Sequence, residues 1–144
     1  MRFHSLTLCG ALAAMPALAG ERPAAPLALE PLSTGLQGAG CSYAQGDDAP
    51  PLLVVDAGPA LAPDKPTARI RVAGREHALV AVQSPDRSRY TYRNEAYVVV
   101  ARDFVETGPG CATNECEGSR YDAVLDITDG RSTATLTVRA HCGA

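Results

Sequence analysis

Alternation of apolar and polar residues dominates the chain after Gly40 and predicts β-strands. Successive side chains of a strand point to opposite faces, so a strand with one buried face has a period of two. In the run Arg69-Ile70-Arg71-Val72 the apolar side chains share one face and the arginines the other. No segment after Gly40 has a sustained helical period. The pattern predicts strands over residues 52–56, 67–72, 76–82, 89–93, 97–104, 120–127 and 132–140.

The turns between these runs indicate antiparallel hairpins. Gly74 directly follows one run and can adopt the positive φ of a tight turn. Asp129-Gly130 is typical of a two-residue type I′ turn, which would place Thr128 opposite Arg131. This register assigns Leu125, Ala134, Leu136 and Val138 to the buried face, and Asp122, Asp126, Thr133 and Thr135 to solvent. The expected fold is all-β, a small antiparallel sandwich or partly closed barrel.

A second hairpin is expected around Asn94-Glu95, where it would pair Tyr92 with Tyr97. Its strands concentrate tyrosine and arginine, two side chains that often carry the binding energy of interfaces. They are also ordinary strand residues, so the tyrosines could instead form the core face of the sheet. The candidate partner-binding residues are Arg87, Arg89, Tyr90, Tyr92, Arg93 and Tyr97.

The N-terminal residues 1–19 have the pattern of an export signal. Arg2 precedes an uncharged apolar run, and Ala17-Leu18-Ala19 supplies the small residues of a cleavage site. The apolar run is about half as long as a membrane span requires, so we expect no transmembrane segment after cleavage. A periplasmic or secreted location follows. Residues 20–40 are rich in proline and glycine and are expected to form a flexible arm, although docking of residues 26–32 on the domain is left open. Residues 41–144 then form the β domain.

Cysteine usage favours two disulfides. Removal of residues 1–19 leaves Cys41, Cys111, Cys116 and Cys142, an even number in a chain expected in an oxidising compartment. Four cysteines allow three pairings. The Asp129-Gly130 register places Cys142 on the apolar face and Cys116 on the other, which favours Cys41 with Cys142 and Cys111 with Cys116.

Charge and motifs exclude several classes of function. The chain has 13 Lys+Arg and 16 Asp+Glu, a net charge of −3, which argues against nucleic acid as a partner. It contains no serine-nucleophile elbow, no calcium-loop spacing and no CxxC pair, so we expect no enzyme, no metal and no cofactor. The alternative is a hydrolase with an unrecognised site. A pocket that gathers His77 or His141 with a carboxylate and a hydroxyl would favour that alternative.

Two resemblances add to this picture. Gly40-Cys41-Ser42-Tyr43 and Ala140-His141-Cys142-Gly143, with Cys111 and Cys116 between them, resemble small exported bacterial proteins that end in cysteine-glycine, a resemblance that implies no activity. The stretch Ser84 to Tyr90, SPDRSRY, is similar to the binding-loop region of membrane-bound C-type lysozyme inhibitors, which are small periplasmic β-barrels. That second resemblance implies roles in inhibition for Ser84, Ser88 and Tyr90.

These observations together predict an exported, non-enzymatic binding or envelope-associated module. Its partner is expected to be a protein or another envelope component. The alternative functions are inhibition of a lysozyme-type enzyme in the periplasm and, less favoured, hydrolysis.

Overall fold

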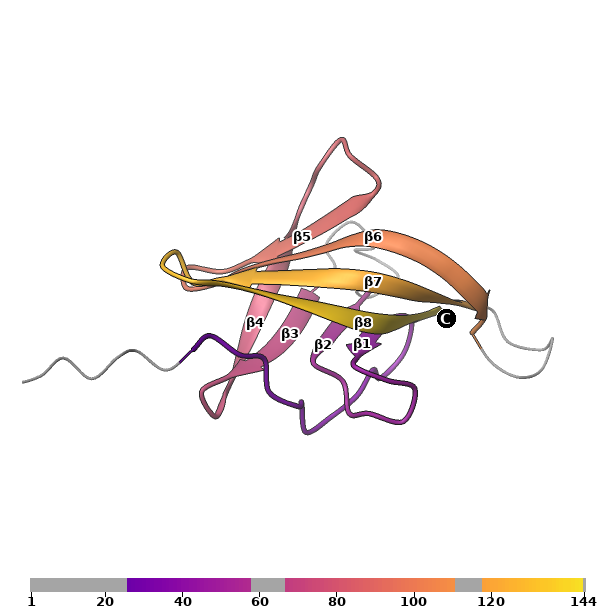
Figure 1. Cartoon of the computed structure of the whole chain (residues 1–144), viewed down its shortest axis with the longest axis horizontal. Helices are drawn as coiled ribbons and strands as arrows, with labels where there is room; N and C mark the ends of the chain where they lie inside the picture. The colour runs from indigo at the N-terminus through magenta and orange to yellow at the C-terminus, as the bar shows by residue number, and fades with distance from the viewer. Residues whose placement is uncertain (1–25, 58–66, 111–117, 144) are drawn as a thin grey trace, which may run out of the picture.

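The chain folds as a closed antiparallel β-barrel. The computed structural model describes residues 26–57, 67–110 and 118–143. Within these ranges there is no helix, and the strands are β1 (Gly40–Ala44), β2 (Leu53–Asp56), β3 (Thr67–Val72), β4 (Arg75–Val82), β5 (Arg89–Arg93), β6 (Val98–Pro109), β7 (Gly118–Thr128) and β8 (Thr133–Gly143). Each strand pairs with the next in sequence, and β8 pairs with β1. The long strands β6, β7 and β8 form a curved layer over β1 to β4 (Figure 1). Of the two architectures expected, the barrel is present and it is fully closed.

Closure depends on β1, a strand that the alternation pattern did not predict. The run Gly40-Cys41-Ser42-Tyr43-Ala44 has only one buried side chain, Tyr43, so its sequence carries no clear period. It is a strand because it pairs on both sides, with β2 and with β8. Gly40 is required there: a Cβ at this position would lie 2.0 Å from the Val55 carbonyl oxygen.

A disulfide joins the two strands of this closing pair. Cys41 on β1 lies directly opposite Cys142 on β8, and their sulfur atoms are bonded. This pairing is the one that the register argument predicted. The other expected disulfide, Cys111 with Cys116, lies outside the described residues, as do the export signal and the start of the proline-rich arm.

The core extends along the barrel interior to the strands that carry the disulfide, since Val55 and Ala140 belong to it and Cys41 and Cys142 pack against it. Alternate residues of the strands point inward, as the period of two predicts, except where a bulge interrupts β6. The largest fully buried side chains are Tyr43, Leu53, Ile70, Leu79, Leu125, Ile127, Val54, Val99 and Val138. Of the set predicted to be buried around the last hairpin, Leu125 and Val138 are fully buried, and Ala134 and Leu136 pack against the core at its edge.

The tight turn expected at Gly74 is present. Val72 pairs with Arg75, so Ala73 and Gly74 form a two-residue loop in which both φ angles are positive. Positive φ at both central positions is the conformation of a type I′ hairpin turn, whose twist matches that of its strands.

The two other predicted hairpins exist, but their registers differ from the expected ones by two residues. Thr128 pairs with Thr133, not with Arg131, and Tyr92 pairs with Val99, not with Tyr97. Each loop has four residues because its first side chain, Asp129 or Asn94, accepts hydrogen bonds from the backbone N–H groups two and three positions later. These bonds are Asp129 with Arg131 and Ser132, and Asn94 with Ala96 and Tyr97. A shift of two residues keeps every side chain on its predicted face.

Residues 26–39 dock on the barrel wall, which decides the point that the sequence left open. Leu32 is buried, and its N–H donates to the Pro51 carbonyl. The Glu30 carboxylate accepts a hydrogen bond from the N–H of Gly74 and forms an ion pair with Arg71. The flexible arm expected over residues 20–40 therefore does not extend to these residues, which cover the turn between β3 and β4.

Candidate functional site

A cavity of about 510 Å³ opens at the end of the barrel that carries the disulfide. We call it the aromatic cup, because four of the chain's five tyrosines and Phe104 line it. The described residues that line it are Cys41, Tyr43, Arg87, Ser88, Tyr90, Tyr92, Phe104, Tyr121 and Cys142. At this end β1, β5 and β7 begin and β4, β6 and β8 finish. The cup therefore lies directly above the core at this end of the barrel, and two of its lining residues, Tyr43 and Tyr92, belong to the core as well.

Small residues opposite the tyrosines leave room for the cup. Ala140 on β8 is the register partner of both Tyr43 on β1 and Tyr121 on β7. Ala101 on β6 lies opposite Tyr90 on β5. Since a methyl group fills little of the space between two neighbouring rings, the aromatic side chains form walls around a hollow and do not close it.

A β-bulge turns Phe104 into the cup. Val99 and Ala101 point inward, so strict alternation would direct Phe104 outward. The register between β6 and β7 shifts by one residue between Arg102 and Val105, and Asp103 within this bulge has φ +56°. An extra residue in one strand inverts the faces that follow it. Phe104 therefore faces inward, and Val105 is 63% exposed.

Phe104 is the centre of the aromatic contacts. Its ring meets Tyr90 at 5.5 Å, Tyr121 at 5.9 Å and Tyr43 at 6.4 Å between centroids, each in an edge-to-face arrangement. Such pairs are attractive because the positive edge of one ring faces the negative face of the other. The bulge thus joins rings from three other strands into one wall.

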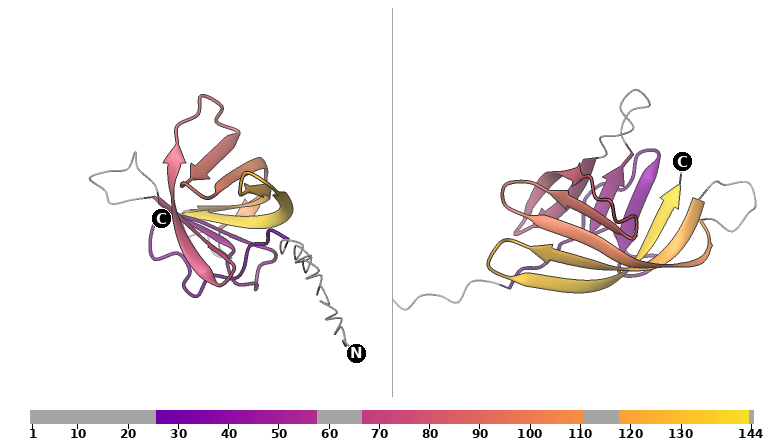
Figure 2. Two further views of the ribbon diagram at one scale, coloured as in Figure 1. Left: turned by 90° about the vertical axis from the view of Figure 1, so that its left-hand side faces the viewer. Right: turned by 90° about the horizontal axis from the view of Figure 1, so that it is seen from above.

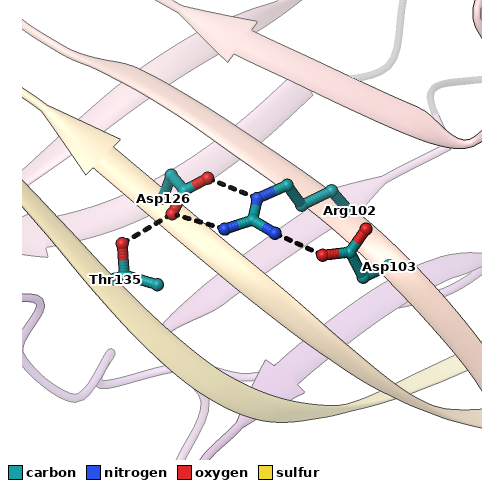
Figure 3. Close-up of polar contacts among 4 residues, drawn as sticks. All are labelled: Arg102, Asp103, Asp126 and Thr135. Carbon is teal, nitrogen blue, oxygen red and sulfur yellow. Dashed lines mark hydrogen bonds and ion pairs between the residues drawn. The ribbon is translucent and has the colours of Figure 1, made fainter.

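Charged groups on the outer face hold the bulge in place (Figure 3). The Arg102 guanidinium donates two hydrogen bonds to the Asp126 carboxylate on β7 and also pairs with Asp103. Thr135 on β8 donates a hydrogen bond of 2.7 Å to the same Asp126 carboxylate. Hydrogen bonds from Arg102 and Thr135, opposed in part by burial, keep the pKa of Asp126 below its ordinary value. The network ties three strands together on the outside of the segment that carries Phe104 on the inside.

The deep part of the cup is neutral. Tyr43 and Tyr92 are only 1% and 5% exposed, whereas Tyr90 at the mouth is 49% exposed. Burial, and to a smaller extent the phenols of Tyr92 and Tyr90, raises the pKa of Tyr43 far above its ordinary value. Burial and the Tyr90 phenol, opposed in part by a hydrogen bond with Tyr43, raise the pKa of Tyr92 to about 12. Both hydroxyls therefore stay protonated and can donate hydrogen bonds.

The loop between β4 and β5 forms one side of the mouth and projects from the barrel (Figure 2). Only three residue pairs join these strands, so the loop rises away from the neighbouring wall. The Asp86 carboxylate accepts hydrogen bonds from the N–H and hydroxyl of Ser88, and the Ser84 hydroxyl accepts one from the N–H of Asp86. These local bonds fix the loop and place Arg87 and Ser88 at the cup.

The predicted partner-binding residues lie in three places. Arg87, Ser88, Tyr90 and Tyr92 line the cup. Ser84 and Arg89 lie on the loop and the start of β5, beside a second hollow of about 230 Å³ that Arg87, Tyr90 and Tyr92 also line. Arg93 is exposed on the outer face, and Tyr97 lies at the far end of the barrel, where its ring packs on His77 at 4.8 Å.

Sequence reasoning missed Tyr43, Phe104, Tyr121 and the disulfide as parts of a site. The alternation around Asp129-Gly130 already placed Tyr121 on the inner face with Leu125. It could not show that Tyr43 and Tyr121 flank the same alanine, because that follows from the pairing of β1 with β8.

The arrangement that would have favoured a hydrolase is not found at the described cavities. His141 lies 3.6 Å from Asp47, and Ser42 is its register partner on β1. His141, Asp47 and Ser42 lie on the outer face, and neither His141 nor His77 is among the described residues that line the cup or the second hollow.

Among the residues that the structure describes, no three His, Cys, Asp or Glu side chains are placed to hold a metal ion. The described ranges also contain no helix long and apolar enough to cross a membrane.

No protein-family model, curated protein or solved structure matches this chain.

Proposed function

We propose that this protein is an exported, non-enzymatic binding module that holds one small, largely apolar ligand in the aromatic cup. The observation that carries the proposal is the cup itself, a hollow of about 510 Å³ walled by five aromatic rings. Sites for small molecules are concave, mostly apolar and typically 300–1,000 Å³ in volume. An eight-stranded barrel has room inside for side chains or for one small ligand, and here the core occupies only part of that room.

The walls suit a ligand that contains a ring or another flat apolar group. Phe104, Tyr90 and Tyr121 present edges and faces to the hollow, and rings bind rings in both arrangements. Hydroxyls of the buried tyrosines supply a few directed hydrogen bonds within an otherwise apolar wall, which is the usual composition of a specific site.

The export part of the proposal rests on residues 1–19 and is compatible with the Cys41–Cys142 bond. Disulfides form and persist in oxidising compartments outside the cytosol. This bond also belongs to the wall of the cup, so the oxidised protein is the form to test.

The first prediction concerns binding to the cup. N-phenyl-1-naphthylamine, a neutral probe whose fluorescence increases in apolar surroundings, should bind the oxidised protein saturably with one site per chain. Phe104→Ala should weaken this binding at least about tenfold, because it removes the ring that contacts three others. Fluorescence titration measures both affinities.

Tyr97→Ala is the matched control, since Tyr97 is the tyrosine outside the cup and should leave the affinity unchanged. Thermal unfolding shows that each variant is folded at the temperature of the titration. Absence of saturable binding, or equal losses in the two variants, would contradict the proposal.

Inhibition of a C-type lysozyme is the second candidate function. The projecting loop carries Ser84 and Ser88, and Tyr90 follows it at the mouth of the cup, so the residues of that resemblance lie together on an accessible edge (Figure 1). Stoichiometric inhibition of lysozyme by the wild type that is lost on substitution of Ser88 by a bulky residue would favour this candidate over a small ligand.

A further inference from the structure

We propose that the ligand of the aromatic cup carries an anionic group, which Arg87 binds at the mouth while the apolar part lies among the rings. This inference rests on the proposed function and names the chemical class of its ligand: a ring-bearing carboxylate, sulfonate or similar amphiphilic anion.

The described lining of the cup contains one cation and no carboxylate. Arg87 is that cation, and the other residues are aromatic, cysteine or serine. The chain as a whole has more acidic than basic groups and a net charge of −3. A cation at an otherwise uncharged apolar hollow, on an acidic protein, is the feature that an anionic ligand needs and that a neutral one does not.

No carboxylate of the described residues forms an ion pair with Arg87. The nearest acid in sequence, Asp86, accepts two hydrogen bonds from Ser88 and faces Arg89. Four arginines of the barrel wall form ion pairs: Arg69 with Asp56, Arg71 with Glu30, Arg102 with Asp126 and Arg139 with Asp47. Arg87 shares the absence of such a pair with Arg75, Arg89, Arg93, Arg120 and Arg131 among the described residues, and it is the one of these that lines the cup. Within the described residues, Arg87 thus keeps its donors available at the mouth, and a guanidinium can bind a carboxylate or sulfonate with two parallel hydrogen bonds.

The cup becomes less polar from its mouth to its bottom, which also suits a ligand with one charged end. Tyr43 and Tyr92 at the bottom are buried, and Tyr90 and Arg87 at the mouth are exposed. A ligand with one apolar end and one charged end can therefore bury the first and leave the second partly hydrated beside Arg87. The reverse orientation would place a charge in the dry part of the hollow, which is costly.

Two probes with the same rings test this inference. 1-Anilinonaphthalene-8-sulfonate is N-phenyl-1-naphthylamine with an added sulfonate, so the difference between their affinities reports the contribution of the anion. We expect the sulfonate probe to bind more tightly to the wild type. Arg87→Gln should weaken its binding about tenfold and should weaken binding of the neutral probe far less, and added salt should weaken only the anionic probe.

Two further arginine variants make the test specific. Arg93 lies on the outer face of the same hairpin, so Arg93→Gln should change the affinity for neither probe. Arg89 lines the second hollow and not the cup, whereas Arg87 lines both. A loss of sulfonate binding in Arg89→Gln that equals or exceeds the loss in Arg87→Gln would therefore place the anion in the second hollow and overturn the inference.

The outcomes separate this inference from the proposed function. Equal affinity for the two probes, or an equal loss of both in Arg87→Gln, would overturn the anion but keep the cup as a binding site. Failure of both probes to bind would remove the proposed function and this inference with it.

Discussion

Asp103 shows how one residue can shape the cup. A non-glycine residue with φ near +56° adopts a sparsely populated conformation, which the surrounding structure must hold in place. Here the ion pairs of Arg102 with Asp103 and Asp126 lie on the outer face, and the reversed alternation brings Phe104 inward. The sequence predicts a strand over 97–104 but contains no glycine or proline to indicate the bulge, so the inward position of Phe104 could not be predicted.

The second prediction concerns the acid sensitivity of this network. Hydrogen bonds from Arg102 and Thr135 lower the pKa of Asp126 in the folded protein, whereas an unfolded aspartate has a pKa of about 3.9. The bonds therefore contribute stability above about pH 4, and this contribution is lost as the pH falls through the lowered folded pKa. Asp126→Asn cannot ionise, so the difference in unfolding free energy between wild type and variant should shrink from about pH 6 to about pH 2.

Urea unfolding at several pH values measures this difference. Asp86 and Asp129, whose pKa values are also lowered, are present in both proteins and cancel in the comparison. A difference that stays constant with pH would show that the charge of Asp126 adds nothing to the stability of the bulge.

At the scale of elements, the sequence predicted seven of the strands and missed one. Alternation is strong where one face is buried along the whole strand, as in β3 and β7. It fails for β1, which has one buried side chain, and for the last residues of β6, which lie beyond the bulge. The hairpin registers were wrong because Asx side chains that bond to the backbone lengthen a loop in a way that the dipeptides Asp-Gly and Asn-Glu do not reveal.

The third prediction is that the loop after β7 depends on the backbone conformation of Gly130. Its φ is +87°, and a Cβ would contact nothing within 4 Å, so any cost of substitution comes from the backbone alone. Gly130→Val should lower the free energy of unfolding by about 1 kcal/mol or more, since a β-branched residue resists positive φ. Gly130→Asn should cost less, because asparagine tolerates this region.

Urea unfolding of the two variants and the wild type measures the loss of unfolding free energy in each variant. The Asp129 hydrogen bonds remain in both variants, so they do not affect the comparison. Equal losses for valine and asparagine would mean that their different tolerance of positive φ does not determine the cost, and would contradict the prediction.

At the scale of the whole molecule, the site is a product of closure. The cup residues come from β1, β5, β6, β7 and β8 and from the loop between β4 and β5, and they meet only because β8 returns to β1. Period and turn chemistry predict single strands and neighbouring pairs. They do not predict that the first and last strands pair, so the cup could be recognised only after the strand order was known.

The last prediction therefore concerns the disulfide that joins the closing strands. Cys41 and Cys142 are 101 residues apart, and in the chain-entropy model a link across a loop of this length contributes up to about 4.7 kcal/mol. Replacing both by alanine should lower the unfolding free energy by a large part of this amount, and by far more than replacing Cys111 and Cys116, because closure entropy grows with loop length. Because both cysteines also line the cup, the variant that lacks Cys41 and Cys142 should bind N-phenyl-1-naphthylamine more weakly even at temperatures where it is folded.

Chemical unfolding and the probe titration, run on both double variants, give the unfolding free energy and the affinity for the probe. If the two double variants lose equal stability, packing around the sulfur atoms, and not chain entropy, sets the contribution of the bond. If the Cys41 and Cys142 variant keeps full affinity while folded, the closing pair of strands supports the fold without shaping the site.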